Sequence, residues 1–147
     1  MAVKIYSLGY EKRSIEEFVD LLKVSKVDIL IDVREKAWSH KKWFCKTNFR
    51  WALQQADIEY VHIPQAGNPK SLRKTSLSSD RVLIEYKKYL QKTHSGLMEL
   101  SNILLIAKYE NKSVCLTCFE KDVNCCHRSI LVDELIGMKI KVVVNHL

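Results

Sequence analysis

The chain is 147 residues long, 47% hydrophobic and 28% charged, which is the composition of one soluble globular domain with a core of its own. It contains neither an apolar run long enough to cross a membrane nor a signal-peptide pattern, so we expect a cytoplasmic protein without a membrane partner. The formal net charge of +7 is concentrated in residues 36–92, where 12 Lys or Arg accompany 4 Asp or Glu. This predicts an anionic small molecule or a nucleic acid as partner, unless the charges serve only to solvate the surface.

The first third of the chain alternates between strand-like and helix-like stretches. Residues 3–8 are β-prone. Ser14, with Glu17 three residues later, has the spacing of a helix capping box, and apolar residues recur at helical spacing over 15–22. Residues 27–33 form a near-continuous apolar run, which is typical of a strand covered on both faces.

The alternation continues to the end of the chain. Thr47 is a candidate cap for the next helix, and a long loop is expected from Gly67 to about Ser79. The remaining predicted strands are 59–63, 113–119 and 140–144, and the remaining helices lie around 83–90, 97–109 and 130–137. Strands separated by helices predict a single α/β domain over residues 1–147, with a mostly parallel sheet of about five strands and helices on both faces.

Polar residues gather where the predicted strands end, and in a parallel α/β sheet ligands bind beyond these carboxyl ends. Asp32 and Arg34 end the second strand, where they either serve chemistry or form a pair that holds loops, and His62 lies at the end of the third. We predict that an anionic substrate is bound by Gly9, Tyr10, Arg13, Arg34, Arg128 and His146.

The segment Cys118-Phe119-Glu120 to Cys126-His127-Arg128 joins the fourth strand to the start of a helix. A thiol beside a helix N-terminus, a histidine and an arginine is stabilised as the reactive thiolate. The same turn could bind an oxyanion, or its cysteines could be buried behind a capping turn. The predicted catalytic residues are the thiols of Cys118 and Cys126 and three groups that would move protons, Asp32, Glu120 and His127.

Four of the five cysteines lie between Cys115 and Cys126, and with His127 they resemble a zinc motif. Residues three apart on a strand face opposite sides, so Cys115 and Cys118 are poorly placed to share a metal ion. We therefore predict no metal and no cofactor, and expect Cys115 in the core.

Every tryptophan lies in residues 36–51, interleaved with basic residues. Basic side chains contact phosphates and aromatic rings stack on bases, so this composition suits single-stranded nucleic acid. The predicted contacts are Trp38, Lys41, Lys42 and Lys46. Alternatively, the aromatic rings of Trp43, Phe44 and Phe49 pack the loop onto the domain while its lysines remain solvated.

Four blocks of the sequence resemble the family catalogued as domain of unknown function 488: residues 8–14, 31–34 and 58–64, and the segment from Cys118 to Arg128. The resemblance implies a compact α/β fold that brings these blocks together. This sequence departs from the family pattern at Lys12 and Asp57, where glycine is common, and at residues 66–68, where a Leu-Gly-Gly-like stretch is usual. The family-like positions are Gly9, Arg13, Asp32, Arg34, Cys118, Glu120, Cys126, His127, Arg128 and His146.

Three alternative functions are compatible with these features of the sequence. The first is an enzyme that acts on an anionic nucleotide or nucleic acid at the Cys/His/Arg segment. The second is a non-catalytic nucleic-acid-binding module that uses the basic, tryptophan-rich loop. The third is a redox-responsive interaction protein in which Cys118 and Cys126 form a reversible disulfide.

Overall fold

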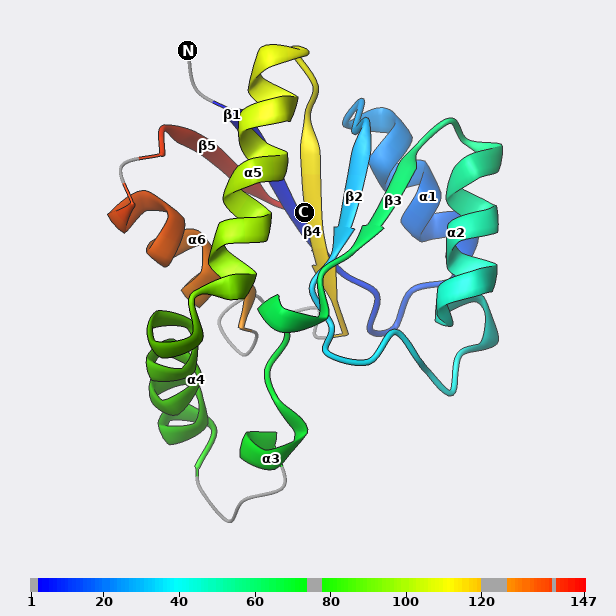
Figure 1. Ribbon diagram of the computed structural model, residues 1–147. Coiled ribbons are helices and arrows are strands. Elements are labelled where there is room, and N and C mark those ends of the chain that lie inside the picture. Colours follow the sequence, from blue (N-terminus) through cyan, green and yellow to red (C-terminus); the bar gives the residue numbers. More distant parts are fainter. Residues whose placement is uncertain (1–2, 74–77, 120–126, 139) are drawn as a thin grey trace.

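A computed structural model describes residues 3–73, 78–119, 127–138 and 140–147. Its centre is a five-stranded parallel sheet with the strand order β3-β2-β4-β1-β5 (Figure 1). The strands are β1 (Val3–Gly9), β2 (Ile29–Asp32), β3 (Glu59–His62), β4 (Val114–Cys118) and β5 (Val142–His146). The predicted α/β fold is confirmed.

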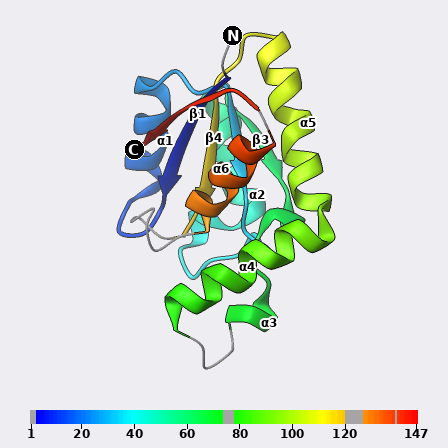
Figure 2. The ribbon, with the colours of Figure 1, turned by 90° about the vertical axis from the view of Figure 1, so that its left-hand side faces the viewer.

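Helices cover both faces of the sheet (Figures 1 and 2). One face carries α1 (Ile15–Val24) and α2 (Lys46–Gln55), and the other carries α4 (Ser79–Thr93), α5 (Ser95–Tyr109) and α6 (Arg128–Gly137). Short helical turns are η1 (Lys42–Phe44), η2 (Pro64–Ala66) and α3 (Lys70–Arg73). The helix α3 interrupts the stretch from Gly67 to Ser79, so the expectation of one continuous loop there was wrong.

Local backbone geometry and hydrogen bonds determine where the helices begin. Ser14 caps α1, since its Oγ accepts from the backbone N–H of Glu17 at 3.1 Å, as the capping-box spacing predicts. The cap of α2 is Cys45 and not Thr47, which lies inside the helix. Cys45 has extended backbone angles, and its Sγ donates to the carbonyl of Ser39 at 3.2 Å.

Two apolar cores lie on the two sides of the sheet, and successive strand residues alternate between them. In β2, Ile29 and Ile31 face α4–α6, while Leu30 faces α1 and α2. Because both faces are covered, β2 is buried throughout, which explains its continuous apolar run.

Two positions at which the resemblance predicts glycine adopt left-handed backbone angles. Lys12 has a φ of 60° and Asp57 a φ of 56°. Side chains are disfavoured in this region by contact between Cβ and the following carbonyl, whereas glycine is not. The resemblance and the backbone geometry therefore agree at both places.

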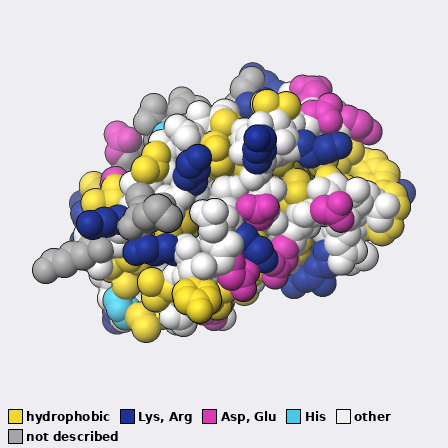
Figure 3. Space-filling model, turned by 90° about the horizontal axis from the view of Figure 1, so that it is seen from above, with side chains coloured by type: hydrophobic (Ala, Val, Ile, Leu, Met, Phe, Trp, Pro, Cys, Tyr) yellow, Lys and Arg dark blue, Asp and Glu magenta, His cyan; other side chains and the backbone are white. Residues whose placement is uncertain are grey.

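No helix in the described segments combines the length and the apolarity needed to cross a membrane. Seen from the amino ends of the strands, acidic and basic side chains are interspersed over the surface (Figure 3). Lys112 and Glu110, for example, form an ion pair of 2.8 Å after α5.

Candidate functional site

The carboxyl ends of the strands bring several predicted site residues close together. Asp32 lies opposite Thr117 of β4 and His62 of β3, and Gly9 lies opposite Cys118. Neighbouring strands are about 4.8 Å apart, so the Cα atoms of Asp32 and Cys118 are roughly 6 Å apart. The two residues are therefore neighbours in the backbone, although their side chains point to opposite faces of the sheet.

The Asp32 carboxylate is fully buried and accepts four hydrogen bonds. Its Oδ1 accepts from the Arg34 backbone N–H at 3.1 Å and from Nε at 2.9 Å. Its Oδ2 accepts from Arg34 Nη2 at 2.7 Å and from the Tyr60 hydroxyl at 2.6 Å. A carboxylate offers about four lone-pair positions, and all are engaged. This geometry fits a group that orients Arg34.

Arg34 links the end of β2 to the tryptophan-rich loop. Its Nη1 donates to the Tyr10 hydroxyl at 3.3 Å and to the Trp38 carbonyl at 3.5 Å, and its guanidinium lies 5.3 Å from the Tyr10 ring centroid. Burial opposes its charge, but the hydrogen bond and the negative charge of Asp32 outweigh burial and hold the pKa of Arg34 above its ordinary value. Burial, reinforced by Asp32, also raises the pKa of Tyr60.

Two histidines hold the backbone at the same strand end. His62 Nε2 lies 2.7 Å from the Arg34 carbonyl oxygen, and His127 Nε2 lies 2.7 Å from the Val33 carbonyl oxygen. A carbonyl oxygen can only accept, so each Nε2 is the donor. His127 is buried, and its ring stands perpendicular to that of Tyr86 at 5.2 Å. The pair fixes two successive peptide groups.

Arg128 and Cys118 lie on the other face of the sheet from the Asp32–Arg34 pair. Arg128 is 1% exposed, and its Nη1 donates to Ser7 Oγ at 2.8 Å. Cys118 belongs to the core beneath α4–α6, whereas Arg34 packs on Phe49 and Tyr10 of the opposite core. The sheet therefore separates the two arginines predicted to bind one anion.

The Cys118 sulfur is part of a disulfide, while Cys45 and Cys115 are free thiols. Cys115 is completely buried on the opposite face, and burial raises the pKa of its thiol to about 12, which suits a core residue. Two other predicted catalytic residues, Glu120 and Cys126, lie outside the described residues. Within the described part of the chain, no three His, Cys, Asp or Glu side chains are grouped to hold a metal ion.

The remaining predicted substrate-binding residues lie at the margins of this edge. Arg13 is partly buried, and its Nε donates to the Gly9 carbonyl at 3.1 Å. His146 is exposed at the end of β5, where partial burial and the charge of Arg128 lower its pKa. Tyr10 is buried, stacked on Phe44 at 4.5 Å.

All three tryptophans are exposed beside this edge. Trp38, Trp43 and Trp51 retain 53%, 44% and 54% of their accessible surface. No acidic residue occurs from Lys36 to Ala56. We define the tryptophan surface as the exposed side chains of Lys36, Trp38, Lys42, Trp43, Lys46, Arg50 and Trp51.

The sequence prediction for this loop needs two changes. Lys41 Nζ donates to the carbonyls of Arg13 at 2.6 Å and Tyr10 at 3.1 Å, so this lysine anchors the loop instead of facing solvent freely. Trp51 joins the surface from α2, and its ring centroid lies 6.0 Å from that of Trp43. Because Phe49 and Leu53 are the buried residues of α2, helical phase alone could have predicted that Trp51 is exposed.

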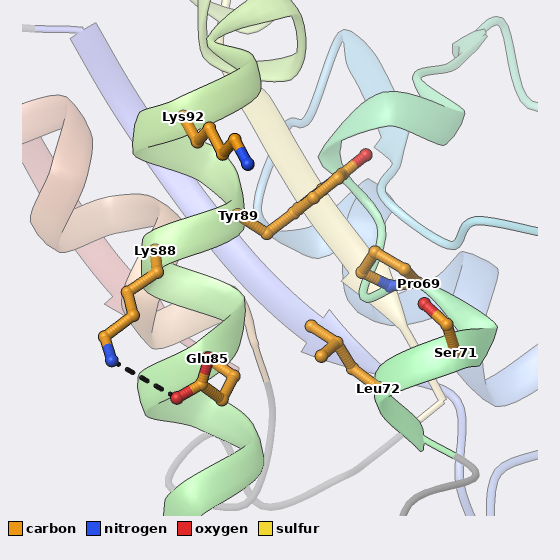
Figure 4. Close-up of a pocket in the computed structure, with 7 residues that line it drawn as sticks. All are labelled: Pro69, Ser71, Leu72, Glu85, Lys88, Tyr89 and Lys92. Atoms are coloured by element: carbon orange, nitrogen blue, oxygen red, sulfur yellow. Dashed lines mark hydrogen bonds and ion pairs between the residues drawn. The ribbon is translucent and has the colours of Figure 1, made fainter.

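A separate hollow of about 310 Å³ lies between α3 and α4 (Figure 4). Its wall includes the Tyr89 ring, and an ion pair of 3.3 Å joins Lys88 to Glu85 at its margin. It is lined by Pro69, Ser71, Leu72, Glu85, Lys88, Tyr89 and Lys92. None of the predicted site residues lines this hollow.

Comparison with known proteins gives one result. The family model described as Domain of unknown function DUF488 matches residues 14–135, which is most of the chain. No curated protein and no solved structure matches. The match confirms the resemblance seen in the sequence blocks, and the chain belongs to the DUF488 family.

Proposed function

We propose that the protein binds single-stranded nucleic acid through the tryptophan surface. One observation carries the proposal: three tryptophans are about half exposed among four exposed basic side chains, in a segment without any acidic residue. The exposed basic side chains can contact phosphates, and the exposed tryptophan rings offer flat faces on which nucleobases can stack. These are the two elements of single-strand binding without sequence preference.

The surface is also held in place before any ligand arrives. Lys41 binds two carbonyls of the β1–α1 connection, Arg34 holds the Trp38 carbonyl, and the Lys46 backbone N–H donates to the Ala37 carbonyl at 3.0 Å. Phe44 and Phe49 pack into the core under the loop. A prearranged surface loses little conformational entropy on binding, which supports useful affinity.

The test is a titration of labelled single-stranded oligonucleotides, followed by anisotropy and by tryptophan fluorescence. Stacking on a base contributes about 1–3 kcal/mol, so Trp38→Ala or Trp51→Ala is expected to weaken binding roughly 5- to 150-fold. Neither ring is buried, so folding is expected to be unaffected. Unchanged affinity in both variants would refute the proposal.

A matched pair of double variants separates local contacts from net charge. Lys42→Ala/Lys46→Ala removes two exposed lysines from the surface, and Lys92→Ala/Lys108→Ala removes two exposed lysines from α4 and α5. Only the first is expected to weaken binding and to reduce the slope of log K against log salt, by about 1.4 for two phosphate contacts. Equal effects would indicate charge alone, and binding to anionic vesicles in place of oligonucleotides would assign the surface to lipid.

The disulfide of Cys118 favours a second candidate, a redox-responsive protein in which this bond forms and breaks reversibly. Reduction should release two thiols that the oxidised protein lacks, and Cys118→Ser should abolish this difference. The same thiol count before and after reduction would remove this candidate.

A further inference from the structure

The two edges of the sheet are built differently. β3 is short, begins with Glu59 and is followed by Pro64, and a charged residue and a nearby proline are both devices that discourage strand pairing. β5 has five residues, Val142–His146, without Asp, Glu, Lys, Arg or Pro. β5 is the last strand in the sheet order and pairs with β1 alone, and Figure 2 shows it in red on the same side of the molecule as α6.

The hydrogen-bond register shows which backbone groups of β5 face outward. The Val3 N–H donates to the Lys141 carbonyl, and the Leu147 N–H donates to the Ser7 carbonyl, at the two ends of the β1–β5 ladder. Alternate residues of a parallel strand bond to the same neighbour, so the N–H and C=O groups of Val142, Val144 and His146 point away from β1. No contact within the described segments satisfies these outward groups.

We propose that β5 pairs with β5 of a second copy of this chain, in antiparallel orientation about Val144. This register places Val144 opposite Val144 of the partner subunit and Val142 opposite His146 of the partner subunit. Every outward N–H then meets a carbonyl, and Lys141 lies opposite an apolar residue and not opposite another lysine. The two sheets become one continuous sheet of both copies.

The neighbouring side chains support the same occupant. The two-fold axis is perpendicular to the sheet, so α6 of each copy lies on the same face of the joined sheet. Glu134 contacts Lys87 and Gln91 of α4, and Ile136 lies about 200° further round the helix, on the flank away from α4. Ile136 is 54% exposed, and Val143 on the opposite face is 50% exposed. Pairing of the two copies would cover apolar surface on both faces.

Val144→Pro tests the pairing directly, since it removes an outward N–H and leaves the bonds to β1 intact; proline is tolerated on edge strands for this reason. Val144→Thr is the matched control, because it keeps the N–H and the branched shape. Sedimentation equilibrium is expected to give a dimer for the natural chain and for Val144→Thr. Val144→Pro is expected to raise the dissociation constant by at least about tenfold.

Ile136→Glu provides a second test that leaves the strand backbone unchanged, and it is expected to weaken the dimer while circular dichroism stays the same. A natural chain that sediments as a monomer at high concentration overturns the proposal. So does a dimer that neither Val144→Pro nor Ile136→Glu weakens. These measurements need no nucleic acid, so their outcome is independent of the proposed function.

Discussion

Replacing Asp32 with asparagine would test whether the end of β2 depends on its buried ion pair. The change keeps the shape of the side chain but removes the charge and turns one carboxylate oxygen into an NH₂ group. If the NH₂ replaces Oδ1, two N–H donors of Arg34 face it; if it replaces Oδ2, Arg34 Nη2 faces it, whereas the Tyr60 hydroxyl can turn to accept. Arg34, which is 7% exposed, would be left without its counter-ion. Loss of one partner of a buried pair costs about 3–5 kcal/mol.

Urea unfolding followed by circular dichroism measures this loss. For a domain of this size the slope is about 1–3 kcal/mol per molar urea, so the midpoint is expected to fall by roughly 2 M. The double variant Asp32→Asn/Arg34→Met has no stranded charge and is expected to recover about 1–2 kcal/mol. Tyr60→Phe removes a single hydrogen bond to the carboxylate and is expected to cost about 1.5–3 kcal/mol.

An Asp32→Asn protein that unfolds within about 1 kcal/mol of the natural chain would refute this reasoning, because the stated cost follows from the buried charge. A double variant less stable than the single one would show that Arg34 stabilises the fold mainly through its contacts with Tyr10 and Trp38.

Three further predictions concern glycine positions and alkaline pH. Gly67→Ala would place a Cβ 2.1 Å from the Glu35 backbone nitrogen and should lower the free energy of unfolding in urea by about 1–3 kcal/mol or more. The control is Gly137→Ala, where the new Cβ has open space and should leave stability unchanged or raise it. Lys12→Gly should stabilise by about 0.5–1 kcal/mol by relieving its left-handed backbone, and a lower melting temperature would contradict this. Burial raises the pKa of Cys115 from 9.0 to about 12, so the neutral thiol makes its full contribution to the free energy of unfolding below pH 9. Between pH 9 and pH 12 this contribution falls by about 1.4 kcal/mol per pH unit. Cys115→Val should show a shallower alkaline decline, and parallel declines would contradict the assignment.

The sequence predicts the sheet well because each strand leaves a local signature. Continuous apolar runs mark β2 and β4, which are covered on both faces, and Ser14 marks the start of α1 through a contact three residues away. The expected helix start at Thr47 was wrong because Cys45 has the extended backbone of a cap residue and its carbonyl already accepts the first intrahelical bond, from the Phe49 N–H at 2.8 Å. Caps depend on backbone angles that residue type only partly determines.

The site is less predictable because side chains from distant positions complete it. Asp32 and Arg34 are only two residues apart, so their pairing can be expected from the sequence. Tyr60 reaches Asp32 from the neighbouring strand β3, and the periodicity of one strand does not tell which strand lies beside it. Lys41 is a basic loop residue of the kind that contacts phosphates, yet its Nζ donates to two carbonyls of the β1–α1 connection. A basic residue in a loop therefore predicts a positive charge but not whether its side chain points to solvent or to the backbone of the domain.

The histidine contacts at Val33 and Arg34 tie three separate parts of the chain together. His62 belongs to β3 and His127 immediately precedes α6, and each imidazole binds a carbonyl of the segment that follows β2. The same segment leads into the loop whose Trp38 carbonyl is bound by Arg34. The edge strand β3 and the start of α6 therefore both help to fix the backbone that leads to the tryptophan surface.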